Sequence, residues 1–240
     1  MPKINKDSTL NITFVGIGLC LLCSAIISFI AIQLRSVQEN NVVLDMQKKI
    51  VSSAGLDEVY GSVENAMSNI KTLIIDLDRG EIVDINPETY ELSKELREDG
   101  KYKFLSAEED VASIKKREKY SKVYIEYKDN EINTLILPVR GYGLWGILYG
   151  YLAIEGDFNT VAGLEFYEHK ETPGLGAEID NPKWKALWKG KKIYQENGEV
   201  SLKVIKGSVM KTSDNFSYEI DGLSGATLTC NGVSNLIAYW

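Results

Sequence analysis

Asp221-Gly222-Leu223-Ser224-Gly225-Ala226-Thr227-Leu228-Thr229 is the stretch around which the rest of the sequence is organised, because small residues there surround two threonine hydroxyls. Its glycines and alanine leave the backbone uncovered, so a bulky group can approach closely. Free N–H groups and a partial positive charge at a helix start would suit a phosphate. From spacing alone, the favoured interpretation is an ordinary Ser/Thr N-cap after a glycine-rich loop. A helix is predicted to begin near residues 224–227, because apolar residues recur downstream with the helical period: Val233, Leu236, Ile237 and Trp240.

The chain has 240 residues, of which 44% are hydrophobic, and a formal net charge of −7. This length is typical of one or two domains, and the apolar fraction is ample for a packed core. Acidic groups exceed basic ones and no basic run occurs, which argues against a nucleic-acid-binding surface.

An uncharged, strongly apolar segment runs from Ser8 to Leu34. At about 1.5 Å per residue it is long enough to cross a hydrocarbon core of roughly 30 Å. The alternative, a cleaved signal peptide, would have a shorter apolar core of about 7–15 residues. The segment is therefore predicted to be a transmembrane helix. Lys3 and Lys6 precede it, whereas acidic residues follow Arg35, so the charge bias places the N-terminus in the cytoplasm.

The cysteines are too few for a disulfide framework or a zinc site. Cys20 and Cys23 form a C-x-x-C inside the apolar segment, where structural cysteines are favoured over an intramembrane metal or redox role. Cys230 has no evident partner in the sequence, and we interpret it as a small buried residue.

Beyond the membrane segment the pattern predicts a helix continuing to Gly55-Leu56, followed by a mixed domain. The predicted organisation is residues 1–8 cytoplasmic, 9–34 transmembrane, 35–56 a juxtamembrane helix and 57–240 a globular domain. Strands outnumber helices and are mostly connected as hairpins, which predicts an α+β fold with a mainly antiparallel sheet. Strands are expected at 71–77, 81–85, 122–127, 134–139, 147–154, 161–167, 192–195 and 200–205, and further helices at 90–98, 107–120 and 176–189.

The opening stretch resembles the flavinylation motif D-G-x-S/T-G-A-T, which is found in the C subunits of the Na⁺-translocating NADH:quinone reductases and in the related G subunits of Rnf complexes. In that family a flavin transferase attaches FMN through its phosphate to the last threonine, which is Thr227 here. The resemblance therefore implies covalent FMN at Thr227, with Ser224, Gly225, Ala226, Leu228 and Thr229 around it.

A second motif, His169-Lys170-Glu171-Thr172-Pro173-Gly174-Leu175-Gly176, looks like the family's loop against the flavin ring. Pro173 and the glycines fix an unusual backbone path whose N–H groups could bond the flavin. The resemblance implies a contribution from Glu171, Thr172, Gly174, Leu175 and Gly176. The loop 141–146 presents an aromatic pair amid glycines, so Leu144 and Trp145 are either ring contacts or core residues at a tight turn.

Other chemistries find little support. His169 is the only histidine, and an ordinary loop role is favoured over metal binding. The sequence offers no catalytic triad and no nucleotide-binding fingerprint, so NADH is expected to bind elsewhere.

The resemblance covers nearly the whole chain. It implies an electron carrier of a bacterial inner-membrane complex that oxidises NADH, reduces quinone and exports sodium, with the flavin domain periplasmic. Its implied partners are the other subunits, a flavin transferase and membrane lipid. Two alternatives stay open: an Rnf-type G subunit, against which the segment from Gln33 to Leu56 argues, and a membrane-tethered flavin-binding module without electron transfer.

Overall fold

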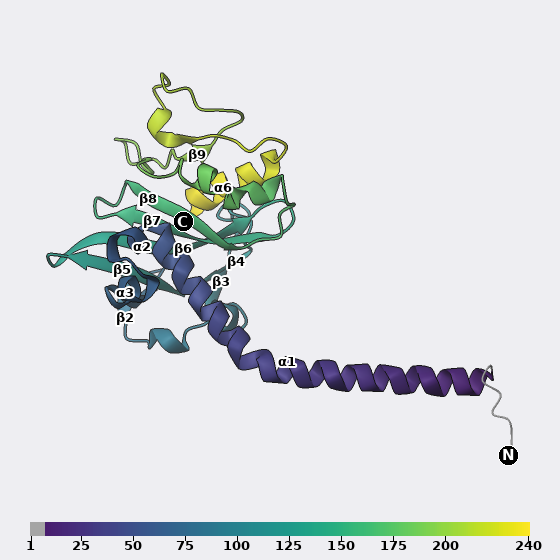
Figure 1. The fold of residues 1–240 in the computed structure, drawn as a ribbon. Helices are drawn as coiled ribbons and strands as arrows, with labels where there is room; N and C mark the ends of the chain where they lie inside the picture. The colour runs from purple at the N-terminus through teal and green to yellow at the C-terminus, as the bar shows by residue number, and fades with distance from the viewer. Residues whose placement is uncertain (1–7) are drawn as a thin grey trace, which may run out of the picture. The chain divides into compact units, whose positions relative to one another are not determined.

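The computed structural model describes residues 8–240. The chain divides into two compact units, of which the first ends at Met46 and the second is Gln47–Trp240. The described part of the first unit is almost entirely helix α1, which runs without a break from Thr9 to Ser53 and ends in the second unit (Figure 1). Within residues 8–240, α1 is long and apolar enough to cross a membrane. The predicted continuation of the helix beyond the apolar segment is confirmed, because no residue between Leu34 and Ser53 leaves the helix.

The second unit is built on a six-stranded sheet in the order β2-β1-β5-β6-β7-β8, with every neighbouring pair antiparallel. The predicted α+β class and the hairpins at 71–85 and 122–139 are confirmed. The sheet strands are β1 (Ile70–Asp76), β2 (Glu81–Val83), β5 (Tyr120–Lys128), β6 (Glu131–Tyr142), β7 (Ile147–Glu155) and β8 (Val161–Glu168).

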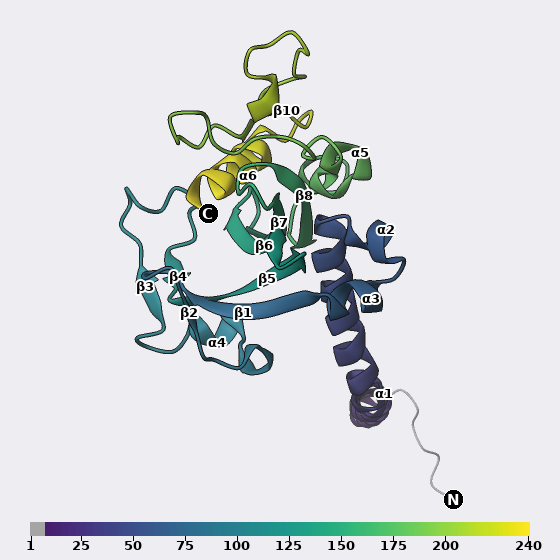
Figure 2. The same ribbon diagram turned by 90° about the vertical axis from the view of Figure 1, so that its left-hand side faces the viewer.

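Both faces of this sheet are covered, because alternate residues of its strands are apolar on each side. On one face, buried residues such as Leu148 and Phe166 pack against Val233 and Leu236 of α6 (Thr227–Tyr239). On the other face, Tyr151 and its neighbours pack against the end of α1, α2 (Leu56–Tyr60) and α3 (Val63–Ser68). Figures 1 and 2 show α6 on one side of the sheet and α2 and α3 on the other.

The end of α1 belongs to the globular unit. Ile50 and Val51 are core residues, and Lys49 pairs with Glu165 of β8 at 3.2 Å. A Cβ at Gly163 would lie 2.4 Å from the carbonyl oxygen of Ser53, so the helix end packs directly on the strand. The sequence placed the start of the domain at residue 57, whereas the compact unit begins at Gln47.

Three predicted helices are wrong in whole or in part. The segment 107–120 contains no helix, because the carboxylate of Asp110 accepts the N–H groups of Ile114 and Lys115 at 2.7 and 2.8 Å and closes a turn there instead. The segment 90–98 is helical only over Leu92–Glu95 (α4). The segment 176–189 divides into a 3₁₀ helix, η2 (Gly176–Asp180), and α5 (Pro182–Lys185).

The remaining elements are short. The predicted strands at 192–195 and 200–205 reduce to two isolated bridges, Thr160 with Lys192 and Tyr194 with Val200, and to β9. Short pairings elsewhere join β3 with β4 antiparallel and β9 with β10 parallel. These elements are η1 (Pro87–Thr89), β3 (Tyr102–Phe104), β4 (Lys116–Glu118), β9 (Lys203–Val204), η3 (Phe216–Tyr218) and β10 (Glu219–Ile220).

Candidate functional site

The start of α6 presents one threonine hydroxyl to solvent and buries the next. Thr227 is the first residue of the helix and is exposed, whereas Thr229 is 0% exposed. Ala226 occupies the N-cap position and supplies no side-chain cap, so the first N–H groups of the helix keep no protein acceptor from a capping side chain. A helix of this length with an uncapped start next to an exposed hydroxyl is suited to an anion held at that hydroxyl.

The residues before this helix anchor it to the neighbouring chain. Asp221 accepts the N–H of Val209 through Oδ1 at 2.7 Å, and its carbonyl accepts the indole N–H of Trp184 at 2.8 Å. A Cβ at Gly222 would lie 2.2 Å from the carbonyl oxygen of Ile205, so only glycine fits there. The first two residues of the motif therefore have a structural role, and the exposed hydroxyl of Thr227 comes after them.

The loop from His169 to Gly176 lies directly against the helix start. Gly174 and Gly225 both have φ of +75°, in the left-handed region that glycine adopts without strain. A Cβ at Gly225 would lie 2.9 Å from Cδ2 of Leu175. The two motifs, separate in sequence, are thus in contact in the structure.

A single buried carboxylate joins the three segments of the site. Glu171 is 5% exposed, and its Oε1 accepts the backbone N–H groups of Leu144 and Trp145, each at 3.0 Å. Its Oε2 accepts the hydroxyl of Thr229 at 2.5 Å. The loop 141–146, the loop 169–176 and α6 therefore meet at one side chain.

Close packing around this carboxylate explains two glycines. A Cβ at Gly143 would lie 2.7 Å from Oε1 of Glu171, and a Cβ at Gly176 would lie 2.6 Å from Oε2. On the far side of the loop, a Cβ at Gly232 would lie 2.3 Å from the carbonyl oxygen of Tyr142, so α6 runs against the same connection. Sequence reasoning did not identify Gly143, although its place in a glycine–aromatic loop was a signal.

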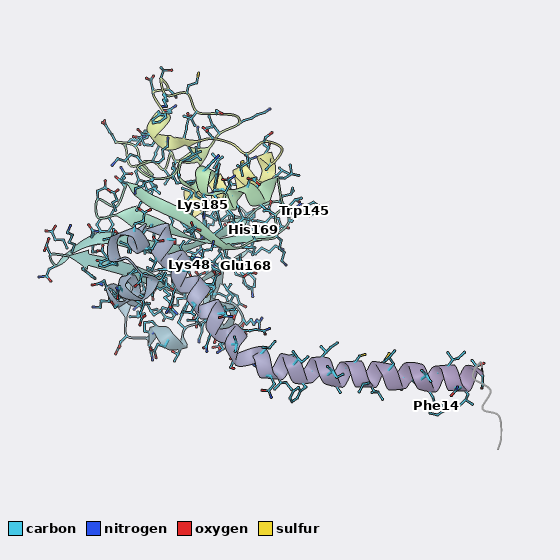
Figure 3. The ribbon with its side chains drawn as sticks, in the orientation of Figure 1. Phe14, Lys48, Trp145, Glu168, His169 and Lys185 are labelled. Atoms are coloured by element: carbon cyan, nitrogen blue, oxygen red, sulfur yellow. The ribbon has the colours of Figure 1, made fainter. Side chains whose placement is uncertain are left out.

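Large apolar side chains around this junction are exposed. Leu144 is 37% exposed, Trp145 62%, Leu175 44% and Leu228 58%. Figure 3 shows Trp145 at the outer end of the β6–β7 connection, on the same side of the domain as His169. Leu144 and Trp145 are therefore surface residues of the site and not core residues. The side chains of Ser224 and Thr172 are also exposed and take no part in the contacts of Glu171.

His169 has a structural place in the loop. Its Nδ1 accepts the N–H of Glu171 at 3.2 Å, and its Nε2 lies 2.8 Å from Oδ2 of Asp180. Since Nδ1 accepts, the neutral ring carries its proton on Nε2 and donates it to Asp180. Two hydrogen bonds therefore hold His169 in the loop. Among residues 8–240, no group of three or more His, Cys, Asp or Glu side chains could hold a metal ion.

Cys230 lies behind the motif, one turn into α6. It is 4% exposed, its Sγ accepts the N–H of Leu223 at 3.2 Å, and burial raises the pKa of its thiol. The prediction of a buried cysteine is confirmed, and its position fixes the backbone just ahead of the exposed hydroxyls.

Comparison with known proteins agrees with this arrangement. The FMN-binding domain family matches residues 143–240, which contain the loop 169–176, α6 and residues 143–146 of the loop 141–146. The crystal structure of Shewanella oneidensis NqrC superposes with a TM-score of 0.73 at 30% identity, covering 81% of this chain and 89% of that one. The C subunit of the Na⁺-translocating NADH-quinone reductase from Parabacteroides distasonis superposes with a TM-score of 0.60 at 29% identity, covering 85% and 92%.

Similarity in sequence extends over almost the full length. The C subunit of the Na⁺-translocating NADH-quinone reductase of Pseudomonas aeruginosa is 46% identical over 98% of this chain and 92% of its own. The Vibrio anguillarum protein of the same name is 41% identical over 98% and 91%. The chain therefore belongs to the family of C subunits of the Na⁺-translocating NADH-quinone reductases, as a membrane-anchored flavoprotein component of an oxidoreductase complex.

Proposed function

We propose that this chain carries FMN in phosphoester linkage to Thr227 and relays electrons from NADH toward quinone in a sodium-exporting complex. The observation that carries this proposal is the contrast between the hydroxyls at the start of α6. Thr227 is exposed on the first turn, whereas the hydroxyl of Thr229 is fully buried and donates to Glu171. An external transferase can reach the first hydroxyl and cannot reach the second.

The residues around Thr227 fit a phosphate and a flat ring. The uncapped start of α6 offers N–H groups and positive potential to a phosphate ester on Thr227. Isoalloxazine is a flat and largely apolar plate, and the exposed side chains of Leu144, Trp145 and Leu175 provide apolar surface beside that point. Ser224, Gly225, Ala226 and Leu228 surround the attachment point in sequence, and the loop Glu171–Gly176 lies against it.

When bound, FMN supplies the reversible uptake and release of electrons, and the protein supplies its position and surroundings. The exposed side chains of Leu144, Trp145 and Leu175 would hold the ring and exclude water from part of it. Thr227 supplies its hydroxyl oxygen as the nucleophile during attachment, and electron transfer itself needs no nucleophile from this chain. The chain is therefore an electron carrier that needs other subunits for NADH oxidation and quinone reduction.

The relatives described above favour this role over that of an Rnf-type G subunit, because they are C subunits of NADH-quinone reductases. They also favour electron transfer over a flavin-binding module without redox function. We place α1 in the bacterial inner membrane with the domain on the periplasmic side, in contact with lipid, the other subunits and, during maturation, a flavin transferase.

Intact mass after denaturation tests the attachment. Wild-type protein co-produced with a flavin transferase should gain the mass of one FMN minus water, and Thr227→Val should gain none, because valine keeps the shape but lacks the oxygen. Thr229→Val is the matched control and should keep the added mass. Covalent flavin on the Thr227 variant, or its loss from the Thr229 variant alone, would show that the acceptor is misassigned.

A further inference from the structure

We propose that Glu171 is a positioning residue, whose buried carboxylate assembles the flavin site before any flavin is attached. This role differs from the one that the sequence motif implies, in which the loop 171–176 simply touches the ring. The two oxygens of the carboxylate face inward, one toward the loop 141–146 and the other toward α6.

The carboxylate of Glu171 accepts at both oxygens, and its two contacts with backbone N–H groups require an acceptor, whereas the Thr229 hydroxyl could also accept. Oε1 takes two backbone N–H groups and Oε2 takes the hydroxyl of Thr229, so all three partners are donors. A carboxylate accepts at both oxygens, whereas an amide would turn a donor toward one of these partners. Hydrogen bonds to a charged acceptor are also stronger than those between neutral groups.

The backbone of Glu171 is held independently of its side chain. His169 accepts its N–H and is itself oriented by Asp180 of η2. Gly143 and Gly176 approach the carboxylate so closely that a Cβ at either position would collide with its oxygens. These close approaches leave the carboxylate a single position. That position fixes the loops 141–146 and 169–176 relative to α6.

The three segments that it joins carry the exposed side chains around Thr227. Leu144 and Trp145 donate directly to Glu171, and Thr229 lies two residues after Thr227. If the proposed function holds, the buried carboxylate of Glu171 would also place a negative charge near the flavin. Such a charge disfavours the electron-rich reduced flavin and lowers its reduction potential.

Amide hydrogen exchange tests the positioning role without flavin. The full chain is produced without the transferase, kept in detergent, and followed by mass spectrometry with residue-level fragmentation. In Glu171→Asp the side chain is too short to reach both the loop 141–146 and α6. The amides of Leu144 and Trp145 should therefore exchange at least about 10-fold faster. In Glu171→Gln the shape persists and the acceleration should be smaller. Wild-type exchange at both amides in both variants would overturn the proposal.

Glu168→Gln is the matched control, because it removes a carboxylate that is exposed at the end of β8 and should leave both amides unchanged. Should the Glu171 variants fail to fold, Thr229 supplies the second test. Thr229→Val removes the donor and should speed exchange at Leu144 and Trp145, whereas Thr229→Ser keeps the donor and should not. Equal protection in these two variants would refute the coupling through Glu171.

The potential of the attached flavin gives the second readout, and it rests on the proposed function. Glu171→Gln removes the charge and should raise the midpoint potential more than Glu171→Asp, which retains it. The potential should thus change more in Glu171→Gln, whereas amide exchange should change more in Glu171→Asp. A purely structural role would give the larger effect in the same variant in both measurements. If wild-type protein carries no covalent flavin, the proposed function fails while the exchange result on Glu171 stands.

Discussion

Gly225 allows the start of α6 to lie close to the loop 169–176. It shares its φ of +75° with Gly174, but a Cβ at Gly225 would meet Leu175 at 2.9 Å, whereas a Cβ at Gly174 would meet nothing within 4 Å. The two positions therefore separate the cost of backbone strain from the cost of crowding the flavin loop.

We expect Gly174→Ala to lower the free energy of unfolding by about 1 kcal/mol, the usual cost of a left-handed alanine. Gly225→Ala should cost the same and also displace the side chain of Leu175. With flavin attached, the absorption spectrum should change more in Gly225→Ala than in Gly174→Ala. Thermal unfolding followed by circular dichroism, with visible spectra, measures both effects. Identical spectra for the two variants would show that the contact between Gly225 and Leu175 has no influence on the cofactor.

At the scale of residues, the sequence predicted which segments form the site but not what holds them together. Glu171 was assigned to the flavin loop, yet its partners lie 27 and 58 positions away in the chain. Local patterns carry no information on such contacts. The burial of Thr229 has the same origin, because its hydroxyl points from the first turn of α6 toward a loop that only the tertiary fold brings near.

At the scale of elements, the strands were predicted more accurately than the short helices. Short, largely apolar runs bounded by turn residues identify β5 to β8, because these strands are buried on both faces over much of their length. The segment 107–120 has residues that suit a helix, but the side chain of Asp110 closes a turn and β4 pairs with β3. The interruption between η2 and α5 at Asn181-Pro182 could have been predicted from the sequence, because a residue before proline avoids the helical region of φ and ψ.

The loop 169–176 can be tested as an element of the flavin site. Leu175 is 44% exposed and lies against the start of α6, so Leu175→Lys should fold and should keep covalent FMN. A positive charge beside the ring favours the reduced flavin, so the midpoint potential should rise and the absorption spectrum should shift. Val59→Lys, at a side chain that is 70% exposed on α2, across the sheet from α6, is the control and should change neither. If Leu175→Lys also changes neither, the loop does not contact the ring.

At the scale of the whole molecule, one continuous helix connects an apolar segment to the flavin domain. Residues 8–46 lie almost wholly in α1, and the last turns of the same helix form part of the core of the second unit. The helix carries no charged residue between Ser8 and Leu34, and its first charges beyond that segment are Arg35 and Glu39. We therefore expect α1 to cross the membrane and the domain to lie on the side reached by its C-terminal end.

The charged residues that flank the apolar segment predict the side of the membrane on which the domain lies. Lys3 and Lys6 precede the apolar segment, whereas Arg35 is followed by Glu39 and Asp45, and short flanks rich in lysine and arginine stay in the cytoplasm. We therefore expect protease added to intact spheroplasts to digest the domain of residues 47–240, while a soluble cytoplasmic marker survives. Reversing the bias, with Lys3→Glu and Lys6→Glu, should protect part of the domain. If wild-type protein is digested only after the membrane is permeabilised, the domain faces the cytoplasm. A periplasmic flavin would then be ruled out even though the flavin site itself would be unaffected.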